Sequence, residues 1–276
     1  MKLTLDNFRK VAEIIYKSNG IHFEEEKIYF LEKRIQARIE TLGIDSVDDY
    51  IFKLRYDDKD GSEIQNLTNQ VTTNETYMFR EFEQLQSFAD VCLPQILLAK
   101  DEVQNRSIRI WSAGCSSGEE PYTLAIILRE VIHDLAQWNV EIIATDIDDM
   151  RLDMARKALY NRRSVNDVPD RYFKKHIVPV GDKYTIHPST KSMVTFKHLN
   201  LLDKMEMRKM RSFDFVFCRN VLIYFDDTSR RTVVDYFYNS MNPSAFVFLG
   251  HSESMGRFST KFNLTRIGQY LVYQKP

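Results

Sequence analysis

The sequence is poor in cysteine, with three residues of this type among its 276: Cys92, Cys115 and Cys218. They are odd in number, lie far apart and show no spacing typical of a zinc site. This pattern excludes a secreted scaffold held together by disulfides. We therefore expect reduced thiols, no metal site and a cytoplasmic protein.

The chain also lacks long apolar runs and an excess of charge. No stretch approaches the roughly 18 consecutive apolar residues of a membrane-spanning helix, and Met1–Lys10 contains no apolar core of a signal peptide. The formal net charge is -1, whereas general nucleic-acid binders are clearly basic. We therefore expect neither membrane insertion nor nucleic-acid binding. The 43% of hydrophobic residues is enough for a full core.

One stretch, residues 108–128, is the most informative part of what is present. Ile108 and Ile110 alternate as in a short strand. A loop of small residues follows, and an apolar helix then begins near Pro121, a residue that the first turn of a helix tolerates. Such a unit forms a ligand cradle at the carboxyl end of a parallel strand.

This loop does not match the dinucleotide fingerprint G-x-G-x-x-G. Ala113 occupies the first glycine position, and Glu119 and Glu120 stand at the helix start, where carboxylates would repel a pyrophosphate. The same pair suits a cationic ligand, and S-adenosylmethionine carries both a sulfonium and an ammonium group. The alternative is that both glutamates only complement the helix dipole, an effect worth about 0.3–1 kcal/mol each.

Helical periodicity dominates the chain before this stretch, and strands alternate with helices after it. The expected N-terminal helices cover about residues 5–18, 24–42, 46–54 and 61–70. A polar and aromatic segment and a helix over 83–100 follow. The expected strands begin at 108 and then cover 140–145, 194–196, 213–218, 245–249 and 269–273, the last antiparallel to its neighbour. This order predicts an α/β fold with a doubly wound, Rossmann-like parallel sheet.

Between 159 and 193 the alternation is interrupted. Short apolar segments on either side of Gly181-Asp182 predict a small inserted antiparallel β-subdomain. We therefore expect three parts: an all-α N-terminal domain over 1–72, a connecting segment and linker helix over 73–107, and a sheet domain over 108–276.

Polar residues follow successive strands, where ligands of such sheets bind. Asp146 ends the second strand, in the usual place for a carboxylate that binds ribose, and Asn200 follows the third, near an adenine edge. Arg219 and Tyr224 come after the most apolar strand, although a salt-bridged structural arginine is an equal alternative there. Asp148 fits a helix cap better than a metal ligand, and we interpret His251 as structural.

Six motifs, in this order, resemble the chemotaxis receptor methyltransferases of the CheR type. They are Thr73-Asn-Glu-Thr-Tyr-Met-Phe-Arg80, Trp111-Ser-Ala-Gly-Cys-Ser-Ser-Gly-Glu-Glu-Pro-Tyr122, Ala144-Thr-Asp-Ile-Asp148, Asn200-Leu-Leu202, Cys218-Arg-Asn-Val-Leu-Ile-Tyr-Phe225 and Gly250-His-Ser-Glu253. The resemblance spans most of the chain. It implies methylation of glutamate side chains on bacterial chemoreceptors with S-adenosylmethionine, which leaves S-adenosylhomocysteine.

The resemblance also implies roles for single residues. Arg80 and Tyr224 would lie near the transferred methyl group and act in catalysis. Glu120 would hold the methionine ammonium and Asp146 the ribose. The remaining residues expected to bind the cofactor are Asn74, Thr76, Arg80, Asn200, Leu201, Cys218 and Arg219. The expected partner is the cytoplasmic domain of methyl-accepting chemotaxis receptors, bound by a monomer.

Two points stay open at this stage. Family members that bind a receptor C-terminal pentapeptide carry a glycine-rich turn in the insertion, whereas 178–184 contains one glycine, so tether binding is in doubt. Lys27, Arg34 and Arg38 share one helix face that either docks the acidic receptor or is only solvated. The alternatives for the whole chain are a methyltransferase of another protein or small carboxylic acid, a non-catalytic S-adenosylmethionine-binding module and, weakest, a dehydrogenase.

Overall fold

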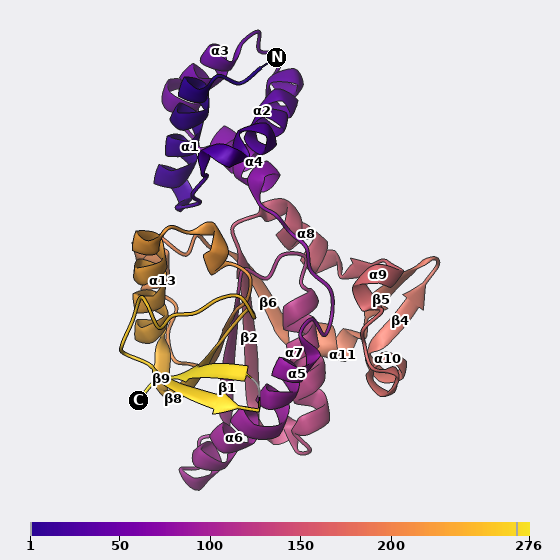
Figure 1. Ribbon diagram of the computed structural model, residues 1–276. Helices are drawn as coiled ribbons and strands as arrows, with labels where there is room; N and C mark the ends of the chain where they lie inside the picture. The colour runs from indigo at the N-terminus through magenta and orange to yellow at the C-terminus, as the bar shows by residue number, and fades with distance from the viewer. Residues whose placement is uncertain (1, 269) are drawn as a thin grey trace. The chain divides into compact units, whose positions relative to one another are not determined.

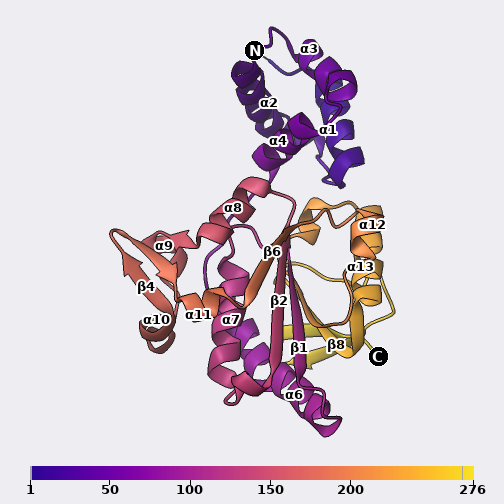
Figure 2. The same ribbon diagram turned by 180° about the vertical axis from the view of Figure 1, so that it is seen from behind.

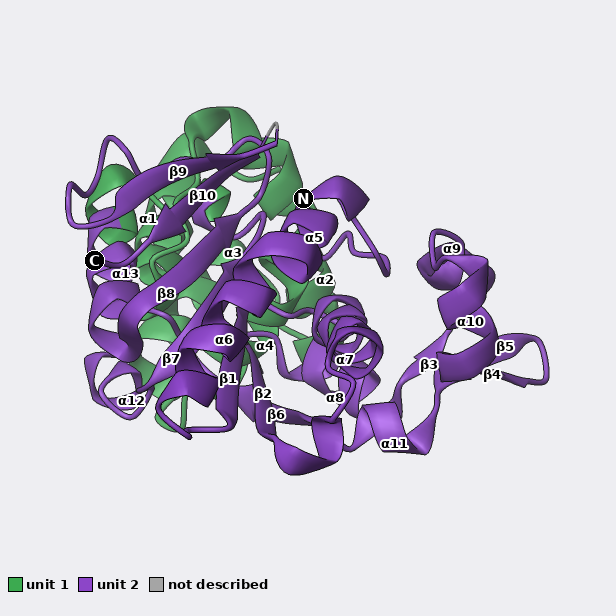
Figure 3. Ribbon diagram, turned by 90° about the horizontal axis from the view of Figure 1, so that it is seen from below, with its two compact units in different colours: residues 1–73, 223–230 green, residues 74–222, 231–276 purple. Residues whose placement is uncertain are grey.

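A computed structural model describes residues 2–268 and 270–276, which form two compact units (Figure 1). The first unit contains residues 1–73 and 223–230, and the second contains 74–222 and 231–276 (Figure 3). The short segment 223–230 thus joins the helical unit, although the sequence pattern placed it with the sheet. No helix in the described part of the chain is long and apolar enough to cross a membrane.

The first unit is helical, as expected. Its elements are α1 (Leu5–Asn19), the 3-10 turn η1 (Glu25–Lys27), α2 (Ile28–Leu42), α3 (Val47–Phe52) with the π-helical turn η2 (Lys53–Asp57), and α4 (Ser62–Val71). Ser46 caps α3 by accepting a hydrogen bond from the Asp49 amide, as its sequence predicts. Apolar side chains from these helices form a core of their own, which includes Phe8, Leu31 and Leu67.

The second unit is built on a seven-stranded sheet of order β6-β2-β1-β7-β8-β10-β9. The strands are β1 (Ser107–Ala113), β2 (Asn139–Asp146), β6 (Val194–His198), β7 (Phe213–Cys218), β8 (Met241–Leu249), β9 (Asn263–Ile267) and β10 (Tyr270–Gln274). Strands β6, β2, β1, β7 and β8 are parallel to one another, and β10 pairs antiparallel with β8 and β9. The predicted doubly wound sheet is confirmed. The sequence analysis missed β9, and Gln269, expected in the last strand, lies outside the described residues.

Helices cover both faces of this sheet (Figures 1 and 2). They are α5 (Phe82–Ser87), the π-helical turn η3 (Phe88–Cys92), α6 (Leu93–Glu102), α7 (Glu119–Val131), the 3-10 turn η4 (Leu135–Gln137), α8 (Asp149–Lys157), α12 (Lys204–Met207) and α13 (Asp227–Ser240). The helix expected over 83–100 is interrupted at η3, because Pro94 has no N–H to continue the regular ladder. Phe88 in that turn packs edge-on against Phe215 and Phe217 of β7.

The insertion over 159–193 contains the predicted hairpin. Strands β4 (Ile177–Val180) and β5 (Lys183–Ile186) pair antiparallel, and β3 (Leu159–Tyr160) completes a three-stranded sheet. Three short helices, which the sequence pattern did not indicate, accompany it: α9 (Arg162–Val165), α10 (Asp170–His176) and α11 (Pro188–Lys191). The insertion is anchored to α7 by His176, whose imidazole contacts Glu130 at 2.9 Å.

Candidate functional site

The register of the parallel strands brings their carboxyl ends to one edge of the sheet. Ala113 of β1 lies opposite Thr145 of β2, and Asp146 lies opposite His198 of β6. On the other side of β1, Cys218 ends β7. The loops after these strands, which carry the predicted site residues of the second unit, therefore meet at this edge.

The loop between β1 and α7 is held tightly against β2. The amides of Gly114 and Cys115 both donate to the Thr145 carbonyl oxygen, at 2.8 and 2.9 Å. Trp111 Nε1 donates to Thr145 Oγ1 at 2.9 Å. Gly114 has a φ of +83°, and an added Cβ would lie 2.3 Å from Val221 Cγ2. The loop thus requires glycine at this point for both its turn and its close approach to the segment after β7.

Glu120 presents its carboxylate from the first turn of α7. Ser112 Oγ donates to Glu120 Oε1 at 2.7 Å, and Arg219 Nη1 lies 3.4 Å from Glu120 Oε2. The Glu120 side chain is 14% exposed. Burial raises the pKa of Glu120 above its ordinary value, and the positive charge of Arg219 opposes that shift. Glu120 is therefore a largely covered carboxylate whose contact to the Arg219 guanidinium is long.

Asp146 is held by two backbone amides at the end of β2. Ser116 N donates to Asp146 Oδ2 at 2.7 Å and Asp148 N donates to Oδ1 at 2.9 Å. Burial raises the pKa of Asp146 to about 6, although both amides favour the ionised form. Asp148 caps α8, as predicted, through the Arg151 amide, and it also accepts from Asn74 Nδ2 at 3.0 Å. Asn74 is thereby brought to the edge that holds Asp146.

The segment containing Asn74, Thr76 and Arg80 is fixed to the second unit by its backbone. Met78 N donates to the Ser164 carbonyl oxygen at 2.8 Å, and Phe79 N donates to Thr123 Oγ1 at 3.1 Å. The Arg80 guanidinium donates to the Glu75 carbonyl oxygen at 2.9 Å. The backbone carbonyl oxygen of Arg80 accepts a hydrogen bond from Arg219 Nη2 at 2.5 Å.

The turn after β6 also reaches this edge. Leu199 N donates to the Asp146 carbonyl oxygen at 3.0 Å, which places Asn200 and Leu201 beside the end of β2. Asn200 Oδ1 accepts from Leu202 N at 2.9 Å, and the Leu201 side chain is buried. Cys218 is fully buried at the end of β7, and burial raises its pKa well above the ordinary value. Cys218 is consequently a neutral thiol that lines the edge and is not a nucleophile.

Tyr224 and the three predicted docking residues belong to the helical unit. The Tyr224 hydroxyl donates to the Thr73 carbonyl oxygen at 3.1 Å. Lys27 lies in η1, and Arg34 Nε donates to the Gln70 carbonyl oxygen at 2.9 Å. Arg38 forms a bidentate ion pair with Glu63, at 2.9 and 2.7 Å, and its side chain is only 13% exposed. Arg38 is therefore largely covered and engaged within this unit, so of the three residues it is poorly placed for the docking face, which stays a prediction.

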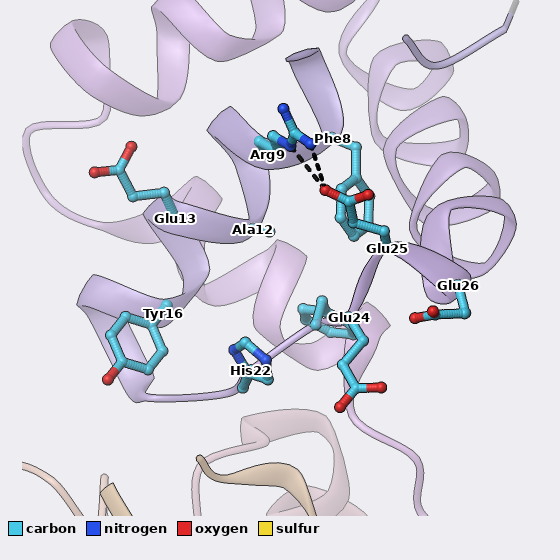
Figure 4. A pocket seen from close by; sticks show the side chains of 10 residues that line it. Phe8, Arg9, Ala12, Glu13, Tyr16, His22, Glu24, Glu25 and Glu26 are labelled. Carbon is cyan, nitrogen blue, oxygen red and sulfur yellow. Dashed lines mark hydrogen bonds and ion pairs between the residues drawn. The ribbon is translucent and has the colours of Figure 1, made fainter. Parts of the chain in front are cut away.

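Two hollows lie away from Glu120 and Asp146. One, of about 400 Å³, lies beside the loop between β1 and α7, and the residues that line it include Asn74, Thr76, Glu119 and Arg151. The other, of about 600 Å³, lies in the helical unit, where Tyr16, His22 and four glutamates surround it and Arg9 pairs with one of them, Glu25 (Figure 4). The excess of carboxylates makes this second hollow unsuited to a glutamate-bearing substrate.

Sequence analysis missed several residues that organise the site. The Ser112 hydroxyl donates to Glu120, and the Ser116 backbone amide donates to Asp146. Both serines lie in a motif whose serines carried no assigned role. Glu253 Oε2 accepts from the amides of Asn220 and Gly250, at 2.7 and 2.8 Å, and so shapes the turn after β7. Glu81, directly after Arg80, lies 3.2 Å from Arg219. In the sequence, the only indication that Glu81 belongs to the site is that it directly follows Arg80, a residue with an assigned role.

The whole chain is similar in sequence to proteins of known family. A family model described as "CheR methyltransferase, SAM binding domain" matches residues 74–271, and "CheR methyltransferase, all-alpha domain" matches residues 6–72. A chemotaxis protein methyltransferase 2 of Vibrio cholerae is 40% identical over 275 residues, 99% of this chain and 94% of the relative. A chemotaxis protein methyltransferase of Borreliella burgdorferi is 35% identical, covering 92% and 90% of the two chains. One of Escherichia coli is 31% identical, covering 94% and 87%.

Proposed function

Because this chain belongs to the CheR methyltransferase family and is an S-adenosylmethionine-dependent methyltransferase of chemotaxis, we propose that it methylates glutamate side chains of chemoreceptors. The products are glutamate methyl esters and S-adenosylhomocysteine. We further propose that it acts in the cytoplasm as a monomer on the cytoplasmic domain of the receptor.

The observation that carries the proposal is the pair of buried carboxylates at the edge of the sheet. Glu120 and Asp146 stand after adjacent strands, and each is held by protein donors that leave part of the carboxylate available. A buried anion without a close cation favours a cationic ligand. Glu120 would accept from the α-ammonium group of the cofactor, and Asp146 from its ribose hydroxyls. Asn200 and Leu201 would meet the adenine.

The chain's own residues need only bind and align the reactants. When bound, S-adenosylmethionine supplies a methyl group activated by its sulfonium. A glutamate side chain has an ordinary pKa of about 4.3 and is already ionised at pH 7, so no general base is required. Arg80 would orient the incoming carboxylate, and Tyr224 would keep the catalytic role that the family resemblance implies. Too tight an ion pair with Arg80 would stabilise the ground state and slow the transfer.

The first test is methylation of purified receptor cytoplasmic fragments with labelled S-adenosylmethionine. We expect label that is released by mild base, as for a methyl ester. Arg80→Ala should lower kcat about tenfold, equivalent to about 1.4 kcal/mol, with a smaller change in cofactor affinity. Arg156→Ala, an exposed arginine of α8 paired with Asp153, is the matched control and should retain full activity.

Other outcomes of this assay separate the alternatives. Transfer to small carboxylic acids but not to receptor fragments would identify a small-molecule methyltransferase. Cofactor binding without any single-turnover transfer would identify a non-catalytic binding module. Unchanged kcat in Arg80→Ala would contradict the role proposed for Arg80.

Cofactor affinity should also depend on pH through Asp146. Its pKa of about 6 means that the carboxyl becomes protonated as the pH falls from 7 to 5, and the neutral form is the weaker acceptor for ribose hydroxyls. The Kd of S-adenosylhomocysteine, measured by calorimetry, should therefore rise below pH 6, by up to about tenfold per unit. Asp146→Asn should bind more weakly and flatten this dependence. A wild-type Kd that is constant from pH 7 to 5 would contradict the role of Asp146.

A further inference from the structure

Arg219 lies between two carboxylates. Its Nη1 is 3.4 Å from Glu120 Oε2, and its Nη2 is 3.2 Å from Glu81 Oε2. The arginine side chain is 4% exposed, whereas the glutamates are 14% and 18% exposed. Since Glu120 is the residue proposed to hold the α-ammonium group of the cofactor, Arg219 competes with that group for the same carboxylate.

Glu81 is held in place by its backbone conformation and by the other oxygen of its carboxylate, Oε1. Its φ is +55°, a left-handed conformation that is strained for a non-glycine residue and persists where the surroundings enforce it. Glu81 Oε1 lies 3.4 Å from the amide of His251, in the turn after β8. The Glu81 carboxylate is thus held against Arg219 Nη2, whereas Glu120 contacts Nη1.

Two buried polar atoms of these segments lack a hydrogen bond to any residue that the structure describes: Arg219 Nε and, three residues after Glu81, Gln84 Oε1. Glu81 Oε2 likewise has no hydrogen bond, but it keeps its ion-pair contact to Arg219 Nη2 at 3.2 Å. Gln84 is 2% exposed, and its Nε2 donates to the Leu249 carbonyl oxygen at 2.8 Å, at the end of β8. Leaving such an atom unpaired is unfavourable. Arg219 therefore keeps one donor, Nε, that neither carboxylate uses, and its two carboxylates share only Nη1 and Nη2.

The charges of this cluster favour an ammonium group beside Glu120. Glu81, Glu120 and Arg219 together carry one net negative charge, which attracts the ammonium part of a ligand. Without Glu81, Arg219 would pair with Glu120 alone and the cluster would be neutral.

We propose that Glu81 is a positioning residue that shares the Arg219 guanidinium and so leaves Glu120 able to bind the α-ammonium group of the cofactor. This inference rests on the proposed function. It makes Glu81 a determinant of specificity for ligands that carry an α-amino group. Glu81 itself need not touch the methyl group or the receptor.

The test measures the binding of two ligands that differ only in the α-amino group. S-adenosylhomocysteine and 5′-deoxy-5′-(3-carboxypropylthio)adenosine, which lacks this group, are titrated into wild type and Glu81→Gln by calorimetry. The variant should bind S-adenosylhomocysteine about tenfold more weakly, while its affinity for the deamino compound should change less than twofold. Glu102→Gln, an exposed glutamate at the end of α6, is the control and should bind both ligands as wild type does.

A double variant tests whether Glu81 acts through Glu120. In a Glu120→Gln background, Glu81→Gln should cause no further loss of affinity, because the carboxylate that it keeps available is gone. Equal losses for both ligands, or no loss for either, would overturn the inference. If instead wild type fails to bind S-adenosylhomocysteine at all, the proposed function itself fails.

Discussion

Glu63→Gln should lower the free energy of unfolding by about 3–5 kcal/mol, the range for a buried ion pair that loses one partner. Glu63 is 3% exposed and accepts from both Arg38, at 2.9 and 2.7 Å, and the Tyr50 hydroxyl, at 2.7 Å. The variant leaves the Arg38 guanidinium in the interior without its counter-charge. Urea unfolding, with hydrogen exchange to localise the loss to the helical unit, measures the effect.

A surface pair in the same unit provides the control. Arg9 and Glu25 also form a short ion pair, at 2.6 Å, but their side chains are 63% and 53% exposed. Glu25→Gln should leave the unfolding midpoint unchanged, because exposed pairs contribute little. A second comparison replaces both buried partners, Arg38→Met with Glu63→Leu, and should destabilise less than Glu63→Gln alone. An unchanged midpoint in Glu63→Gln would show that this pair is not a stabilising element.

This prediction also changes how receptor docking should be tested. Replacing Arg38 by glutamate would disrupt the helical unit, so a loss of methylation would carry no information about docking. Lys27, which is exposed, is the residue of the proposed docking stripe that can be changed without this effect. Reduced methylation at low salt in Lys27→Glu, with unchanged cofactor binding, would support a docking role.

Gly114→Ala should abolish detectable cofactor binding and destabilise the sheet unit. The new Cβ would lie 2.3 Å from Val221 Cγ2, so the loop after β1 and the segment after β7 must move apart. Overpacking of this kind costs about 1–3 kcal/mol, in addition to about 1–2 kcal/mol for an L-residue at a φ of +83°. Calorimetry with S-adenosylhomocysteine and thermal unfolding measure the two effects.

Gly181→Ala separates the two causes. Gly181, in the turn between β4 and β5, also has a positive φ, +60°, but nothing lies within 4 Å of an added Cβ. This variant should show only the smaller backbone cost and bind the cofactor normally. If both alanine variants bind S-adenosylhomocysteine as wild type does, the loop does not need the close approach at Gly114.

Most of the architecture was predictable from the sequence because it depends on local patterns. The period of 3.6 in 5–15 and the apolar strand 213–218 indicated a helix and a buried strand without any long-range information. The site edge followed from one general rule, since polar residues such as Asp146 and Asn200 come directly after parallel strands. The argument against a pyrophosphate ligand was likewise local, because it depended only on the charges of Glu119 and Glu120, which are adjacent in the sequence.

Interruptions of these patterns were less predictable. The helix expected over 83–100 contains Pro94. A proline in a helical pattern indicates that the helix can break there, but it does not indicate whether the break is a kink, a loop or a π-helical turn. The π-helical turn at 88–92 places Phe88 against β7, a contact that depends on the position of the sheet. The membership of 223–230 in the helical unit also follows from contacts and not from pattern.

By itself, the sequence determined the helical and sheet parts and the family resemblance, and it identified Glu120 and Asp146 as candidate cofactor ligands. Only the tertiary structure decided which charges are buried and with whom they pair. Arg38 and Arg219 are ordinary cations in a sequence pattern, yet each lies against glutamates that are distant in the chain, Glu63 for one and Glu81 and Glu120 for the other. The physical reason is that periodicity reports which face of an element a residue occupies, whereas the energy of a charge depends on what covers that face.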